Sequence, residues 1–126
     1  MTTQNVTIPA LSGGSFSAYL AAPNTQPRAG IVLIQEILGV NNTMRQIADD
    51  YAKAGYLVIV PDLYWRLEPG VQLDADDKDQ WAKAIELLGA FDVDSGVEDL
   101  KATLSFLRQV SQQHRQGRQC GLLYGW

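Results

Sequence analysis

Short apolar runs and amphipathic stretches alternate along most of the chain. Residues 31–37 (IVLIQEI) and 56–62 (YLVIVPD) are mostly apolar and show no polar alternation, which is typical of strands buried on both faces of a parallel sheet. Apolar side chains at helical spacing predict helices over residues 39–55, 78–91 and 94–110. Strands that alternate with helices predict right-handed crossovers and an α/β fold.

The first part of the chain has a different pattern. Residues 5–22 contain two β-rich segments, NVTIPA and SFSAYLAAP, separated by LSGGS. Gly13 and Gly14 suit a tight turn that needs positive φ angles. We therefore expect an N-terminal antiparallel hairpin attached to a mainly parallel sheet.

Residues with capping and stopping preferences mark the ends of the expected helices. Asn41 or Asn42 can cap the first helix, and Gly55 can end it. Asp94 or Ser95 can cap the last helix. The apolar stripe of this last helix, expected to be buried, consists of Val97, Leu100, Leu104 and Leu107.

Composition narrows the class of protein. The chain has 126 residues, enough for one domain, with 46% hydrophobic and 19% charged residues. The net charge of −4 disfavours nucleic acid, which is bound largely through Lys and Arg contacts to phosphate. No apolar run is long enough for a membrane span, and the first residues lack a signal-peptide pattern, so we expect a cytoplasmic protein. A single cysteine, Cys120, excludes an internal disulfide, and no metal-ligand cluster or cofactor motif is present.

Several motifs occur in a familiar order. The segment that begins QEILGVN runs through a helix into AGYLVIVPDLYWR, then PG in a loop, then AFDVDSGVEDL at the start of the last helix. In these motifs, residues 5 to about 110 resemble the dienelactone hydrolase (carboxymethylenebutenolidase) family of the α/β-hydrolase fold. The resemblance implies hydrolysis of small esters or lactones by a Cys-His-Asp triad.

The same resemblance assigns roles to two residues after the first buried strand. Glu36 matches the family's glutamate, which is thought to lie against the resting cysteine and to help control its ionisation. The backbone N–H of Ile37 matches one of the two donors of the oxyanion hole. From spacing alone, a solvated or salt-bridged carboxylate at a strand end is the alternative for Glu36.

Aromatic residues dominate the region where the family holds its substrate. Members that act on dienelactone carry an arginine in the helix after the aromatic loop, where it binds the substrate carboxylate. Here Trp81 stands near that position, with only Lys78 and Lys83 as cations, so dienelactone itself is a doubtful substrate. Tyr64, Trp65 and Trp81 either line a pocket or pack the loop against the sheet edge.

The last residues do not continue the pattern. In this fold the next strand leads into a nucleophile elbow, G-x-C-x-G, but SQQHRQGRQ follows Val110 without any apolar residue. Cys120 has Arg118 and Leu122 where the elbow needs glycine. His114 is expected to be a solvated histidine and Arg66 a surface residue.

A shift of reading frame accounts for this tail. A coding sequence compatible with GRQCGLLYGW, read one base later, gives AGNVGYCMGG, which contains the required elbow. We therefore predict that residues 1–110 are the N-terminal portion of a hydrolase-like domain, truncated before the elbow, and that residues 111–126 are an aberrant, frameshifted tail. A chain without the triad should be inactive and poorly stable. The alternatives are a non-catalytic α/β binding or interaction module and an enzyme that uses Cys120 with His114.

Overall fold

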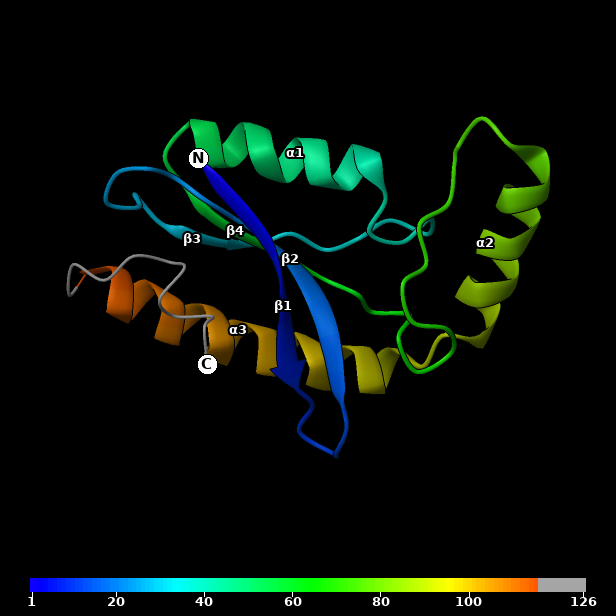
Figure 1. Ribbon diagram of the computed structural model, residues 1–126. Coiled ribbons are helices and arrows are strands. Elements are labelled where there is room, and N and C mark those ends of the chain that lie inside the picture. The colour runs from blue at the N-terminus through cyan, green and yellow to red at the C-terminus, as the bar shows by residue number, and fades with distance from the viewer. Residues whose placement is uncertain (116–126) are drawn as a thin grey trace.

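The computed structural model describes residues 1–115 of the chain, and Figure 1 shows the arrangement of its elements. The structure confirms the predicted α/β fold. The strands are β1 (Thr2–Pro9), β2 (Ser15–Ala22), β3 (Gly30–Val32) and β4 (Leu57–Pro61). The helices are α1 (Asn42–Lys53), α2 (Lys78–Ala90) and α3 (Val93–Arg115).

The described strands form one sheet in the order β1-β2-β4-β3. Strand β2 pairs antiparallel with both β1 and β4, and only β3 and β4 pair in parallel. The predicted hairpin is confirmed, and Gly13 and Gly14 at its turn have φ angles of +111° and +76°. The prediction that the sheet is mainly parallel is wrong for residues 1–115. The hairpin joins the sheet through the antiparallel pairing of β2 with β4, so the sheet is mixed.

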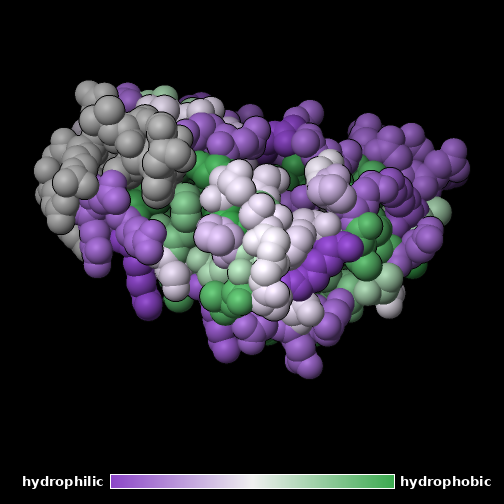
Figure 2. Space-filling view, turned by 60° about the horizontal axis from the view of Figure 1, so that its bottom comes forward, coloured by the Kyte–Doolittle hydropathy of each residue, from purple (hydrophilic) through white to green (hydrophobic). Residues whose placement is uncertain are grey.

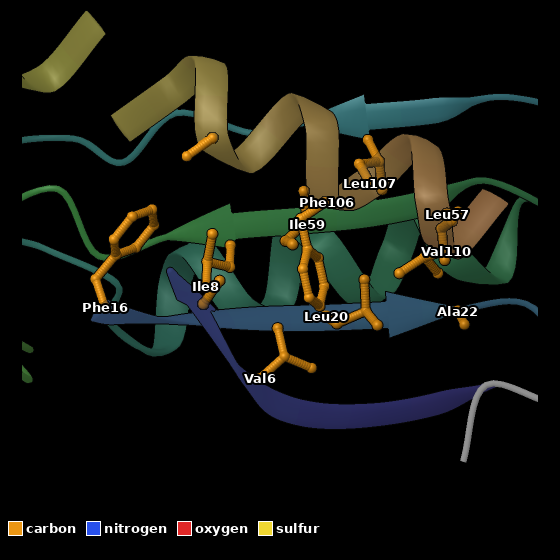
Figure 3. Close-up of a cluster of buried hydrophobic side chains, with 12 residues drawn as sticks. Val6, Ile8, Phe16, Leu20, Ala22, Leu57, Ile59, Phe106, Leu107 and Val110 are labelled. Carbon is orange, nitrogen blue, oxygen red and sulfur yellow. The ribbon is translucent and has the colours of Figure 1, made fainter. Parts of the chain in front are cut away.

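Helices cover both faces of this sheet (Figure 1). Helix α1 packs on one face against residues such as Val58 and Val60, and α3 packs on the other against Leu57 and Ile59. Figure 3 shows the second of these cores, where Phe106 and neighbouring α3 side chains meet those of β1, β2 and β4. Alternate residues of β4 thus supply both cores, which explains why the whole strand is buried.

The predicted ends of α1 are confirmed. Asn41 is the N-cap, and its side chain accepts a hydrogen bond from the Met44 N–H at 3.1 Å. Gly55 follows the C-cap with a φ angle of +105°, a conformation that favours glycine and ends the helix.

Helix α3 differs from the prediction at both ends and on its buried face. Asp92 caps it, because its Oδ1 accepts from the Asp94 N–H at 3.2 Å and its Oδ2 from the Ser95 hydroxyl at 2.7 Å. The helix continues past Val110 to Arg115. Two residues of the expected stripe, Val97 and Leu104, are 44% and 41% exposed. The face that packs on the sheet keeps Leu107 of the expected stripe but also includes two polar residues. Its buried side chains belong to Asp99, Ala102, Thr103, Phe106, Leu107 and Val110.

Strand β3 is shorter and less buried than residues 31–37 were expected to be. Its ladder with β4 ends with the hydrogen bond from Leu33 N–H to the Ile59 carbonyl, and Ile34 is 56% exposed. The reason is its place at the edge of the described sheet, where only one side of the strand is paired.

Large apolar side chains also reach the surface of α2 and α3. Figure 2, which brings the α3 side of the molecule forward, shows hydrophobic residues between polar ones on that side. The large apolar residues of α2 and α3 that are at least 40% exposed are Ile85, Leu88, Val93, Val97 and Leu104.

Within residues 1–115, no helix combines the length and the apolar character that crossing a membrane requires.

Candidate functional site

The loops that follow β3 and β4 lie together at one end of the sheet. Because β3 and β4 are parallel and adjacent, their carboxyl ends meet at the same edge. Residues 33–40 follow β3, and residues 62–77 follow β4. This edge is where open α/β sheets bind ligands, so it is the candidate site.

A tight turn at residues 36–39 forms the centre of this edge. The Gly39 N–H donates to the Glu36 carbonyl at 3.1 Å, and Gly39 has a φ angle of +81°. The segment after β4 packs across the turn, where the Leu73 N–H donates to the Leu38 carbonyl at 2.9 Å. A Cβ atom at Gly39 would lie 2.2 Å from the Val71 carbonyl oxygen, so the turn can approach this segment only with glycine there.

Glu36 and Ile37, the two residues named from the sequence, occupy this turn side by side. The Glu36 side chain is exposed, and no group in the described part of the chain bonds its carboxylate. The salt bridge is therefore not found in residues 1–115, whereas the exposed carboxylate agrees with the other form of that alternative, a solvated carboxylate. Ile37 is half-buried, and among the same residues its backbone N–H has no acceptor, although both neighbouring peptide groups are hydrogen bonded.

Two side chains that the sequence did not single out for this role tie the loops together. The Tyr64 hydroxyl donates to the Ile37 carbonyl at 3.0 Å. Gln35 accepts from the Leu63 N–H at 2.8 Å and donates to the Glu36 carbonyl at 3.2 Å. The sequence could have indicated both residues through the topology of the sheet. Polar or aromatic residues that come just after two adjacent parallel strands lie at the same edge.

Asp62 shapes the start of the loop after β4. It is buried, and its carboxylate accepts from the Tyr64 N–H at 3.2 Å and the Gly70 N–H at 2.8 Å. Burial raises the pKa of Asp62, and the two N–H donors offset only part of that rise. These bonds close the loop of residues 62–70 and so fix the position of Tyr64.

Trp65 and Arg66 anchor the same loop to α3. Trp65 stacks on Phe16 with ring centroids 5.7 Å apart, and its Nε1–H donates to Asp99 Oδ2 at 2.9 Å. Arg66 lies over the Trp65 ring and donates to Asp99 Oδ1, also at 2.9 Å. Arg66 is exposed, which confirms the expected surface residue, and it also pairs with the buried carboxylate of Asp99. Of the two possibilities for Trp65, packing of the loop is the one confirmed.

Trp81 lies on α2 with 37% of its surface exposed. Its indole N–H donates to the Ala75 carbonyl, and no described contact joins it to Glu36 or Ile37. No group of three or more potential metal ligands is found in residues 1–115. Cys120 lies outside the described residues, as does the side chain of His114.

Comparisons with known proteins agree on one family. The family model described as "Dienelactone hydrolase family" matches residues 16–121. The chain is 39% identical over 108 residues to a carboxymethylenebutenolidase of Pseudomonas putida, which covers 86% of this chain and 46% of that protein. It is 36% identical over 110 residues to carboxymethylenebutenolidase 1 of Cupriavidus pinatubonensis, covering 87% of this chain and 47% of that protein.

A solved structure supports the same relationship. A crystal structure from Klebsiella pneumoniae, described as a dienelactone hydrolase, superimposes with a TM-score of 0.70 at 28% identity. The match covers 86% of this chain and 44% of that one. The chain therefore spans less than half the length of the relatives that it matches.

Proposed function

Because the chain belongs to the dienelactone hydrolase family, we propose that it supplies the oxyanion-hole part of an ester or lactone hydrolase. The observation that carries the proposal is the Ile37 N–H, which has no acceptor among residues 1–115 and lies in a turn held by hydrogen bonds on both sides. In this function the N–H donates to the carbonyl oxygen of a small ester or lactone as a nucleophile attacks it. One such donor typically contributes a factor of about 100 to 1,000 in kcat.

Glu36 has the complementary role in this proposal. Its exposed carboxylate faces the attacking cysteine of the complete site and disfavours a second negative charge there, so the cysteine ionises only when substrate is bound. In this proposal, residues 1–115 do not supply the cysteine, histidine and aspartate of the family's triad. By itself the chain is therefore expected to be inactive. The proposal includes the division of the chain into a hydrolase-like portion, residues 1–110, and an aberrant tail, residues 111–126.

The test compares the 126-residue chain with a hybrid enzyme. In the hybrid, residues 1–110 precede the part of the Pseudomonas putida relative that this chain does not match. We expect no release of 4-nitrophenol from 4-nitrophenyl acetate by the chain alone, and thiol-dependent release by the hybrid. A folded but inactive hybrid would contradict the proposal and favour a non-catalytic binding module. Thiol-dependent activity of the chain alone, abolished by Cys120→Ser, would favour chemistry by Cys120 with His114.

Trp81 predicts the substrate class of the same site. An indole cannot bind a carboxylate as an arginine does, so we propose that the site accepts uncharged esters or lactones rather than dienelactone. In the hybrid, Trp81→Arg should raise kcat/KM for a carboxylate-bearing lactone about 10-fold relative to 4-nitrophenyl acetate, a change typical of one charge-assisted hydrogen bond. Lys83→Arg is the matched control, because Lys83 already pairs with Glu68 at 2.7 Å. Equal effects of the two changes would show that Trp81 does not contact the substrate.

A further inference from the structure

The direction of the Ile37 N–H is set by the peptide group that it shares with Glu36. A peptide group is planar, so the Glu36 carbonyl and the Ile37 N–H turn together and point in opposite directions. The Glu36 carbonyl accepts from the Gly39 N–H at 3.1 Å and from Gln35 Nε2 at 3.2 Å. The Ile37 N–H cannot rotate unless both of these bonds are distorted or broken.

The peptide group on the other side of Ile37 is held as well. Its carbonyl accepts from the Tyr64 hydroxyl at 3.0 Å. Tyr64 is only 3% exposed, and its ring contacts Phe91 edge to face with centroids 6.0 Å apart. Because the Tyr64 ring is buried and packed, its hydroxyl is held in place. The hydroxyl therefore restricts the position of the Ile37 carbonyl and does not move with the loop after β3.

The hydrogen bonds on both sides of Ile37 depend on Leu63 and Tyr64, the two residues that follow Asp62. Tyr64 donates to Ile37 directly, and the Leu63 N–H holds Gln35 Oε1 at 2.8 Å, which aims Gln35 Nε2 at the Glu36 carbonyl. The loop after β4 thus fixes the loop after β3 on both sides of the Ile37 N–H, which has no acceptor within residues 1–115.

We propose that Tyr64 and Gln35 are positioning residues that hold the Ile37 N–H in the direction that a developing oxyanion requires. The inference rests on the proposed function of Ile37 as an oxyanion donor. An oxyanion hole is effective because its donors are oriented before the reaction, so that no free energy is used to reorient them as charge develops. The Tyr64 hydroxyl is protonated and able to donate across the neutral range, because the ordinary pKa of tyrosine is about 10 and burial raises the pKa of Tyr64 further.

Amide hydrogen exchange of the full 126-residue chain tests the positioning without any catalysis. The Gly39 N–H reports on the turn, since it donates to the Glu36 carbonyl, and the Leu57 N–H, which donates to the Ala29 carbonyl at 3.0 Å, is an internal reference. Tyr64→Phe removes the hydroxyl and keeps the ring. We expect exchange at Gly39 to become about 5-fold faster while Leu57 is unchanged, the factor that corresponds to one net hydrogen bond.

Two further variants separate the loss of the Tyr64 bond from a general change in stability. Tyr51→Phe removes a hydroxyl for which the structure gives no bond within residues 1–115, and it should change neither amide. Gln35→Glu keeps the acceptor for the Leu63 N–H and loses the donor to Glu36, so it should also speed exchange at Gly39. If Gly39 exchanges at the same rate in Tyr64→Phe and the parent, or if Gly39 and Leu57 speed up equally, the positioning role is wrong.

Activity of the hybrid enzyme separates this inference from the proposed function. If both are correct, Tyr64→Phe lowers kcat about 10-fold and leaves KM for 4-nitrophenyl acetate unchanged, because the oxyanion forms only in the transition state. A loss that appears only in KM would overturn the positioning role. If the parent hybrid is inactive, the proposed function fails, and the exchange rates of Gly39 still decide whether Tyr64 and Gln35 hold the turn.

Discussion

Replacement of Gly39 by alanine should lower the free energy of unfolding by about 3 kcal/mol, the sum of backbone strain and overpacking. The strain arises because Gly39 has a φ angle of +81°, which an L-residue with a side chain rarely adopts. The overpacking arises because the new Cβ atom would lie 2.2 Å from the Val71 carbonyl oxygen and 2.9 Å from its carbon. Both contacts are with backbone, so relief requires the 71–73 segment to move away from the turn.

Gly70→Ala is the matched control for this change. Gly70 has a nearly equal φ angle of +77°, but a Cβ atom there would meet nothing within 4 Å. It should therefore lower stability by only about 1 kcal/mol, the strain alone. Urea denaturation followed by circular dichroism measures both variants. Equal losses would show that contact with Val71 does not restrict residue 39, and the close packing of the two loops would be contradicted.

Features that depend on local chemistry could be predicted from the sequence. The Asn41 cap, the Gly55 stop and the hairpin at Gly13 and Gly14 are each determined by residues within a few positions, and each is confirmed. The order of strands and helices was also predictable. The pairing of the strands was not, because the hairpin pattern does not indicate that β2 pairs with residues of β4 that lie 37 to 43 positions further along the chain.

The face of α3 that packs on the sheet shows why its buried residues could not all be predicted from the sequence. Periodicity favoured Val97 and Leu104, yet both are exposed, and Asp99 is buried at 1% exposure. A buried carboxylate contradicts the hydrophobic pattern unless its partners are known, and those partners, Trp65 and Arg66, lie more than 30 residues earlier. A local sequence pattern cannot indicate hydrogen bonds between residues that lie so far apart in the chain.

The candidate site was predictable to a similar extent. Glu36 and Ile37 were named because their motif resembles that of a family, and the structure places them at the carboxyl end of β3. Gln35 lies in the same motif, and Tyr64 in the motif after β4, but neither was linked to Ile37, the proposed oxyanion donor. Their proposed role depends on hydrogen bonds within and between two loops, which a motif does not encode.

Replacement of Asp99 by alanine should have the second largest effect, a loss of about 2 to 3 kcal/mol in the free energy of unfolding. The change removes the only described acceptor of the Trp65 indole N–H, and it leaves a cavity beneath the loop after β4. It also removes the acceptor 2.9 Å from Arg66 Nη2, which keeps only its bond to the Ser12 hydroxyl at 3.3 Å. Breaking a fully buried pair would cause a larger loss. Arg66 is 28% exposed, so water can solvate part of its charge once the carboxylate is gone.

The matched control is the other described ion pair, Lys83 with Glu68, whose side chains are 43% and 48% exposed. Glu68→Ala should change stability by less than about 1 kcal/mol, because an exposed pair is solvated in either state. A double-mutant cycle then separates the two bonds of Asp99, since Trp65→Phe removes the indole N–H and keeps an aromatic ring next to Phe16. If Asp99→Ala and Glu68→Ala are equally mild in urea denaturation, the buried carboxylate does not anchor the loop. A large loss for Asp99→Ala with a clear coupling to Trp65→Phe would instead establish that α3 holds this loop, and with it Tyr64, against the end of the sheet.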